Sequence, residues 1–157
     1  LEAISNYKDK EFPLDALFKV YIDHPITFTM DYNSSNLDQL DNSFIYYLMY
    51  DKVQSIRIQD IDHIMPKSIL ESMNYDQAKI NSIKNFQLID YGTNRGEKNG
   101  KPFKEWINNP KFVSDKKAFI LRHLIPQDEN IWTENKFDDF LEERGKIILS
   151  KINENIS

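Results

Sequence analysis

Apolar residues recur at helical spacing through most of this chain. The spacing predicts helices over 14–22 and 37–50 and a final helix from Thr133, a plausible N-cap, to about Asn155. The helix over 37–50 is expected to be amphipathic, and Ser35 followed by Asp38 resembles a capping box at its start. Most of the chain is therefore expected to form helical scaffold.

Just before an Asp-His pair, the spacing of apolar residues changes from the helical period to every second position. Apolar and polar residues alternate over 55–62, which predicts a half-buried strand that Pro66 ends. A helical spacer follows, and the short apolar run FQLID, 86–90, predicts a second strand. An alternating stretch at 26–32 fits either a short strand or an extended connector.

Proline and capping residues elsewhere in the chain predict further helices. Pro66 opens a short helix, and a second helix is expected over 76–83. Pro102 starts another helix, and Ser114 is the expected cap of a helix that Pro126 ends. Few, separated strands among many helices predict a mostly helical α+β domain with a small two-stranded core.

Length and composition fit one domain with a real core. The chain has 157 residues, 40% of them apolar, and its many aromatic side chains can fill that core. No segment approaches the about 20 apolar residues that span a bilayer, so no membrane association is expected. The chain lacks cysteine, so a metal would need oxygen and nitrogen ligands. The composition is compatible with a cytoplasmic setting, and the missing initiator Met suggests a fragment of a longer protein.

Charge is unevenly distributed along the chain. The formal net charge is −5, which taken alone argues against a nucleic-acid partner. Residues 92–122, however, carry eight Lys or Arg against three acidic residues, a net charge of +5 that leaves −10 elsewhere. A basic segment beside the Asp-His pair is what a phosphate-backbone binder needs, although a solvated helical face is the simpler interpretation of a charge run alone.

The residues that could carry chemistry gather in one stretch, 59–104. It contains Asp62 and His63, then Asn85 and Asn94, then Lys98, and three of the four glycines of the chain. A neutral histidine can take a proton from water, and a divalent cation such as Mg²⁺ can neutralise the charge that develops on a phosphate. Mg²⁺ prefers oxygen ligands, which a carboxylate and an amide carbonyl supply.

The residue types predict a division of labour for phosphodiester hydrolysis. His63 is the candidate base, Asp62 and Asn94 are the candidate metal ligands, and Lys98 is the candidate phosphate contact. Asn85 is expected to tie the loop after His63 to the second strand and to fix the orientation of the imidazole. Each piece alone has a plainer explanation as a capping pair, a polar loop or a turn, and His24 and His123 are interpreted as structural.

Together these motifs resemble the HNH (His-Me finger) endonuclease family. The resemblance rests on D-x-D-H-I-x-P at 60–66, N-F-Q-L-I at 85–89 and T-N-R-G-x-K-N at 93–99. It implies a ββα-metal core of two short antiparallel strands and a helix, wrapped by further helices. It also implies cleavage with one Mg²⁺ or Mn²⁺ that leaves 5′-phosphate and 3′-hydroxyl ends.

The same resemblance implies roles for individual residues. His63 resembles the general base, Asp62 and Asn94 the metal ligands, and Asn85 the asparagine that braces the site. Lys98 falls where many members keep a basic residue, and Asp60 resembles an auxiliary acid. The residues expected to contact nucleic acid are four basic side chains of the same stretch: Arg95, Lys98, Lys101 and Lys104.

A wider similarity covers roughly residues 35–155. The helix before the first strand, the KPFKEWI segment and the C-terminal helix look like the C-terminal domain of GmrSD-type, modification-dependent restriction proteins of bacteria. The similarity implies antiphage restriction of DNA and an NTP-using, ParB-like domain upstream in the same chain. On this basis 35–157 is expected to be the HNH nuclease domain, and 1–34 a lead-in segment.

Two other functions remain open at this point. The chain could be a catalytically inactive module that binds or senses nucleic acid within a larger restriction protein, through the basic 92–122 segment. It could also be a purely structural domain in which the Asp-His pair braces a loop. Metal-dependent cleavage separates the first hypothesis from both alternatives.

Overall fold

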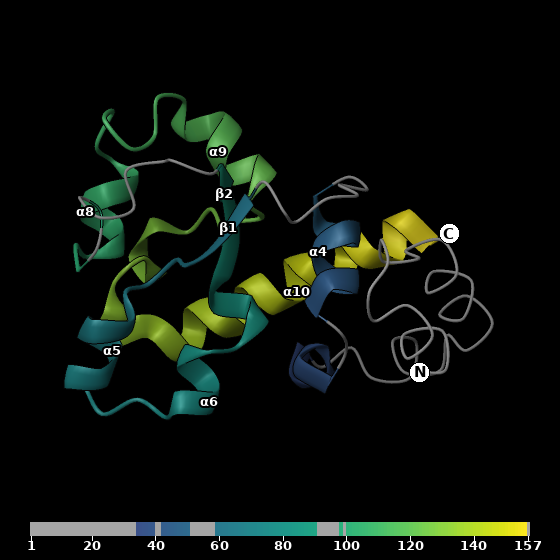
Figure 1. Cartoon of the computed structure of the whole chain (residues 1–157), viewed down its shortest axis with the longest axis horizontal. Coiled ribbons are helices and arrows are strands. Elements are labelled where there is room, and N and C mark those ends of the chain that lie inside the picture. Colours follow the sequence, from purple (N-terminus) through teal and green to yellow (C-terminus); the bar gives the residue numbers. More distant parts are fainter. Residues whose placement is uncertain (1–33, 40–41, 51–58, 91–97, 99, 157) are drawn as a thin grey trace.

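A computed structural model describes residues 34–39, 42–50, 59–90, 98 and 100–156 (Figure 1). The described part is mostly helical, with one two-stranded antiparallel sheet. The predicted helix over 14–22, the alternating stretch at 26–32 and His24 lie outside these ranges. Within the described residues, none of the helices combines the length and apolarity that a membrane span requires.

The described elements follow one another in a simple order. They are the 3-10 helix η1 (Ser34–Gln39), α4 (Asn42–Met49), β1 (Gln59–His63), α5 (Lys67–Ser72), α6 (Gln77–Ile80), the 3-10 helix η3 (Ile83–Asn85), β2 (Phe86–Asp90), α8 (Phe103–Ile107), α9 (Lys116–Arg122), the 3-10 helices η4 (Glu129–Ile131) and η5 (Glu134–Lys136), and α10 (Phe137–Ile156).

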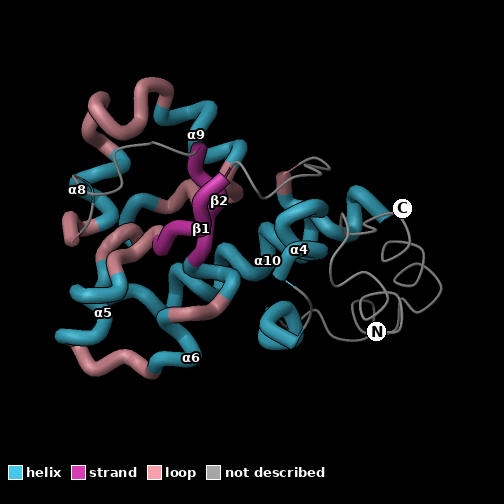
Figure 2. Tube along the Cα trace, in the orientation of Figure 1, coloured by secondary structure: helices cyan, strands magenta, loops and turns pink. Residues whose placement is uncertain are grey.

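The two predicted strands form one pair, joined through the helices α5 and α6 (Figure 2). β1 and β2 are antiparallel, with Asp62 opposite Gln87 and His63 opposite Phe86. Pro66 ends the strand region and stands at the N-cap of α5, as its fixed φ favours. The spacer of α5, α6 and η3 thus returns the chain so that β2 can pair with β1.

The 20-residue helix α10 contributes buried residues to both hydrophobic clusters of the fold (Figure 1). Residues of its N-terminal half, among them Phe137 and Phe140, are buried in a cluster with α5, α6 and α8. Residues of its C-terminal half, among them Ile148 and Ile152, are buried in a second cluster with α4 and β2. The predicted apolar stripe of the final helix is therefore confirmed, and it serves two cores.

Several predicted helix starts are wrong in detail. The helix expected over 37–50 has a 3-10 segment at its start, and its residues 45–50 are all buried, so this part of it is enclosed rather than amphipathic. The Asp38 carboxylate accepts hydrogen bonds from the Ser82 hydroxyl (2.7 Å) and the Ile83 amide (2.8 Å) at the start of η3. The side chain of Ser35 lies outside the described residues, so the capping box stays a prediction.

The caps near the C-terminus also differ from expectation. Asp115, not Ser114, caps α9, since its carboxylate accepts from the Ala118 amide at 3.0 Å. Thr133 precedes the short helix η5 without capping it through its side chain, and α10 begins four residues later.

A buried polar cluster joins the two halves of the fold around Arg144. Its guanidinium is fully buried and donates to the carbonyls of Ile83 (3.3 Å), Lys84 (2.7 Å) and His123 (3.0 Å). His123 is buried and hydrogen-bonded through Nδ1 to the Tyr50 hydroxyl at 2.8 Å. Burial, with Arg144 nearby, lowers the pKa of His123 to about 3, so the ring is neutral and plays the structural part expected of it.

Candidate functional site

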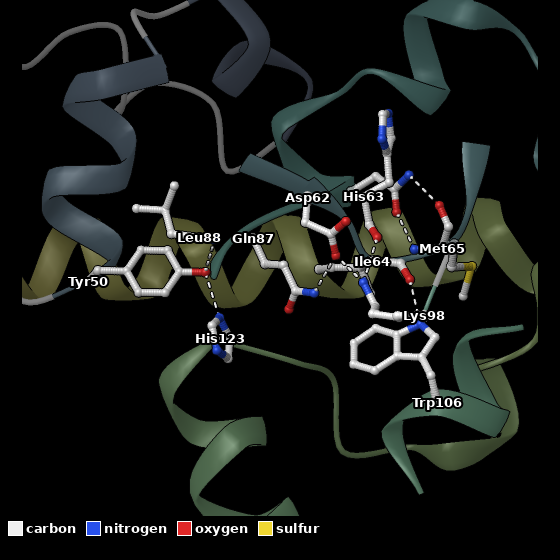
Figure 3. Close-up of polar contacts among 11 residues, drawn as sticks. Tyr50, Asp62, His63, Ile64, Met65, Gln87, Leu88, Lys98, Trp106 and His123 are labelled. Atoms are coloured by element: carbon white, nitrogen blue, oxygen red, sulfur yellow. Dashed lines mark hydrogen bonds and ion pairs between the residues drawn. The ribbon is translucent and has the colours of Figure 1, made fainter. Parts of the chain in front are cut away.

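The predicted Asp-His pair lies at the end of β1, but its two side chains contact different groups. Adjacent residues of a strand point to opposite faces. The Asp62 carboxylate meets Gln87 and Lys98, whereas the His63 ring points away from it (Figure 3). The strand ends where the sequence predicted, and the backbone of His63 still reaches the Asp62 side of the site, because its carbonyl lies 3.4 Å from the Lys98 ammonium.

The Asp62 carboxylate is the electrostatic centre of the site. It is 9% exposed. Its Oδ2 forms a close ion pair with the Lys98 ammonium and accepts a hydrogen bond from the Gln87 side-chain amide at 3.1 Å. Lys98 is 8% exposed, and its ammonium also lies 4.1 Å from the centre of the Trp106 ring. A buried ion pair is stable only when further groups support both charges, as Gln87 and the Trp106 ring do here.

The His63 ring has its own support. Its Nε2 lies 3.0 Å from the Asn81 side-chain oxygen, and its face packs on Phe86 with ring centres 4.7 Å apart. In the tautomer that donates from Nε2 to this oxygen, Nδ1 keeps its lone pair. The ring is half-buried, so Nδ1 can act as a base toward a water at the surface of the site.

Asn85 braces the loop that follows His63. It is fully buried, and its Oδ1 accepts from the Met65 amide at 2.9 Å. Its Nδ2 donates to the carbonyls of Met65 (3.2 Å) and Ile80 (3.1 Å), and its own carbonyl accepts from the Ile64 amide at 2.8 Å. The expectation that Asn85 ties this loop to the second strand is confirmed. Asn81, not Asn85, contacts the imidazole directly, so a role of Asn85 in orienting the ring stays a prediction that would act through the braced loop.

Trp106 fixes the other wall of the site. Its indole N–H donates to the Ile64 carbonyl at 3.1 Å, and its ring lies beneath the Lys98 ammonium. Trp106 is buried in α8, which begins after Pro102 as predicted. The same side chain thus connects the loop after His63 with the cation that pairs with Asp62.

The structure brings some predicted site residues together and leaves others outside its description. Asp62, Lys98 and the backbone of His63 meet, and Asn85 lies directly behind them. Asn94 and Arg95 lie outside the described residues, as does the side chain of Asp60. Lys101 is half-buried with Glu105 3.4 Å away, and Lys104 is exposed on α8, so these two lie at the surface, whereas Lys98 does not.

Sequence reasoning missed Asn81, Gln87 and Trp106. Gln87 had a usable signal, because it is a polar residue inside a short apolar strand, and it is buried there. Asn81 had none, since its contact with His63 depends on how the chain turns between α6 and η3. Trp106 looked like an ordinary core residue of its helix.

The donor set around Asp62 fits a hard divalent cation. The buried Asp62 carboxylate already pairs with one positive charge, the Lys98 ammonium. The buried Oε1 of Gln87 has no hydrogen-bond partner in the described part of the chain. Carboxylate and amide oxygens are what Mg²⁺ and Mn²⁺ prefer. No three His, Asp or Glu side chains gather within the described ranges, and the candidate ligand Asn94 lies outside them.

Compared with protein-family models, with curated proteins and with solved structures, the chain matches none.

Proposed function

We propose that this chain is a metal-dependent HNH endonuclease domain that hydrolyses DNA phosphodiester bonds. The observation that carries the proposal is the buried Asp62 carboxylate, supported by Lys98 and Gln87, next to a histidine whose ring Asn81 orients at the end of a two-stranded sheet. The motif resemblance adds the ββα-metal core, with the segment around Asn94 as its helix.

In this mechanism the chain supplies a base, a carboxylate and a lysine. His63 takes the proton of the attacking water at Nδ1, and the Asn81 oxygen stabilises the imidazolium that forms at the other nitrogen. Asp62, with Asn94, would hold Mg²⁺ or Mn²⁺, which supplies neutralisation of the charge developing on the phosphate. Lys98 stands within the site as a second positive charge toward that phosphate.

Asn85 has a supporting role in the same scheme. By binding both backbone groups of Met65 it fixes the loop that leaves His63, so the base and the carboxylate keep their relative positions. A displacement of about 1 Å at such a site can lower the rate about 100-fold. We therefore assign Asn85 as a positioning residue.

The setting of the reaction follows from the resemblance alone. We propose that the domain acts in bacterial antiphage restriction and that an NTP-using, ParB-like domain in the same protein selects the DNA. The basic residues Arg95, Lys101 and Lys104 would then contact the phosphate backbone, and the acidic remainder of the chain would contribute little affinity.

Nicking of supercoiled plasmid DNA tests the proposal. The wild type should cut with Mg²⁺ or Mn²⁺ and not with EDTA, and His63→Ala should lower the rate by about 10²- to 10⁴-fold. Gln77→Ala, an exposed change far from the base in sequence, is the control and should cut like the wild type. Undiminished cleavage by His63→Ala would remove His63 as the base. Salt-sensitive DNA binding without cleavage under either metal would favour the inactive binding module instead.

A further inference from the structure

Gln87 is a buried amide of which only one half is used. The residue is 0% exposed, and its Nε2 donates to Asp62 Oδ2 at 3.1 Å. Its Oε1 is enclosed and has no hydrogen-bond partner in the described part of the chain. Buried amide oxygens are nearly always hydrogen-bonded in native proteins, so this enclosed acceptor beside a carboxylate calls for a donor other than the described residues.

We propose that Gln87 positions the divalent cation at Asp62 by accepting, at Oε1, a hydrogen bond from the hydration shell of that cation. The inference rests on the proposed function. Mg²⁺ and Mn²⁺ keep several waters when few protein groups bind them, and these waters are strong hydrogen-bond donors. The Gln87 N–H meanwhile orients the carboxylate, so one side chain would hold both the ligand and the solvent around the ion.

The position of Gln87 in the sheet supports this assignment. It stands directly opposite Asp62 in the β1–β2 register, so the sheet itself fixes the distance between the two side chains. Gln87 and Lys98 also converge on the same oxygen of Asp62, which sets the plane of the carboxylate. A group held this rigidly can orient an ion without a change in the backbone.

The chain offers a matched control. Gln77 also donates its Nε2 to a carboxylate, Glu71 Oε1, at 3.0 Å, but both side chains are exposed. Gln77→Met and Gln87→Met therefore remove the same kind of hydrogen bond, one in solvent and one in the site. Gln87→Glu is the second informative variant, because it keeps an acceptor while it loses the amide donor.

Titration of Mn²⁺ into the whole chain, followed by calorimetry, tests the proposal. Gln87→Met should weaken Mn²⁺ binding by about tenfold or more, Gln87→Glu should bind within about threefold of the wild type or more tightly, and Gln77→Met should bind like the wild type.

Wild-type affinity in a folded Gln87→Met variant would overturn the inference. If that variant fails to fold, loss of binding in a folded Gln87→Glu variant would overturn it equally. If the wild type shows no Mn²⁺ binding that Asp62→Asn removes, the proposed function has failed, and this outcome is distinct from the failure of Gln87 alone.

Discussion

Asn85 and Gln87 lie two residues apart, and both are fully buried amides, but the chain uses them differently. Every side-chain polar group of Asn85 is bound, its oxygen to the Met65 amide and its nitrogen to two carbonyls. Gln87 binds through its nitrogen alone and leaves an enclosed oxygen without a partner in the described residues. The first amide completes the fold, and the second keeps an acceptor that none of the described residues binds.

The contrast extends to the regions around the two amides. In the loop braced by Asn85, the backbone groups of Ile64 are hydrogen-bonded. Its amide donates to the Asn85 carbonyl, and its carbonyl accepts from the Trp106 indole. The region around Gln87 gathers a buried carboxylate and a buried ammonium, an arrangement that is expensive to desolvate and that apolar residues could often replace without loss of stability. A stable fold needs the first region, whereas the second is the region in which the metal site is proposed.

The largest predicted effect breaks the brace. Asn85→Ala leaves the amide and carbonyl of Met65 and the carbonyl of Ile80 without partners in a buried place. We expect the free energy of unfolding to fall by at least about 3 kcal/mol, measured by urea denaturation. Asn108→Ala, which removes an exposed amide that donates to the Lys104 carbonyl and accepts from the Lys116 ammonium, should change it by no more than about 0.5 kcal/mol. Similar losses in the two variants would contradict the distinction between a buried brace and a surface contact.

A second buried polar cluster, around Arg144, makes stability depend on pH. The pKa of His123 is lowered from 6.5 to about 3 by burial and by Arg144, so the unfolded chain binds more protons than the folded chain between these values. Stability from this group is complete above pH 6.5 and is lost as pH falls toward 3. The slope it adds is at most about 1.4 kcal/mol per pH unit.

Urea denaturation between pH 4 and pH 7.5 would measure this slope, with His123→Gln as the comparison. Glutamine keeps an acceptor for the Tyr50 hydroxyl but does not titrate, so the variant should show a flatter dependence than the wild type. Identical slopes in the two proteins would show that His123 does not control acid stability.

The smallest effect on stability is expected at Asn81, where the effect on activity is larger. Asn81→Ala removes an exposed side chain, so the free energy of unfolding should change by no more than about 0.5 kcal/mol. The His63 ring loses the oxygen that holds its proton on Nε2, and we expect the cleavage rate at pH 7 to fall about tenfold, with a changed pH–rate profile. An unchanged rate and profile would mean that the ring is oriented by Phe86 alone.

The sequence predicted the parts of this fold that local chemistry determines. Pro66 and Pro102 begin helices because their rings fix φ, and the FQLID run forms β2 because nothing in it favours a turn. The predicted cap at Ser114 was wrong, since the neighbouring Asp115 accepts from the amide that a cap would bind. The local sequence pattern does not show which side chain will accept the hydrogen bond from a free helix amide.

The candidate site divides in the same way. Asp62, His63, Asn85 and Lys98 were identified because their residue types and spacing fit phosphodiester chemistry. Asn81 and Gln87 were not, since one depends on the turn between α6 and η3 and the other on the register of the two strands. Register is set by pairing across the sheet, which a single strand does not reveal.

The central claim is that the Asp62 region is built to hold a divalent cation, and the melting temperature with and without Mn²⁺ tests it most directly. A cation that binds only the folded chain, present at about 100 times its dissociation constant, adds about 2.7 kcal/mol of stability. The wild type should therefore melt several degrees higher with Mn²⁺ than with EDTA. Asp62→Asn, which keeps the shape and removes the charge, should lose that rise. An equal rise in both proteins, or no rise in the wild type, would contradict the account.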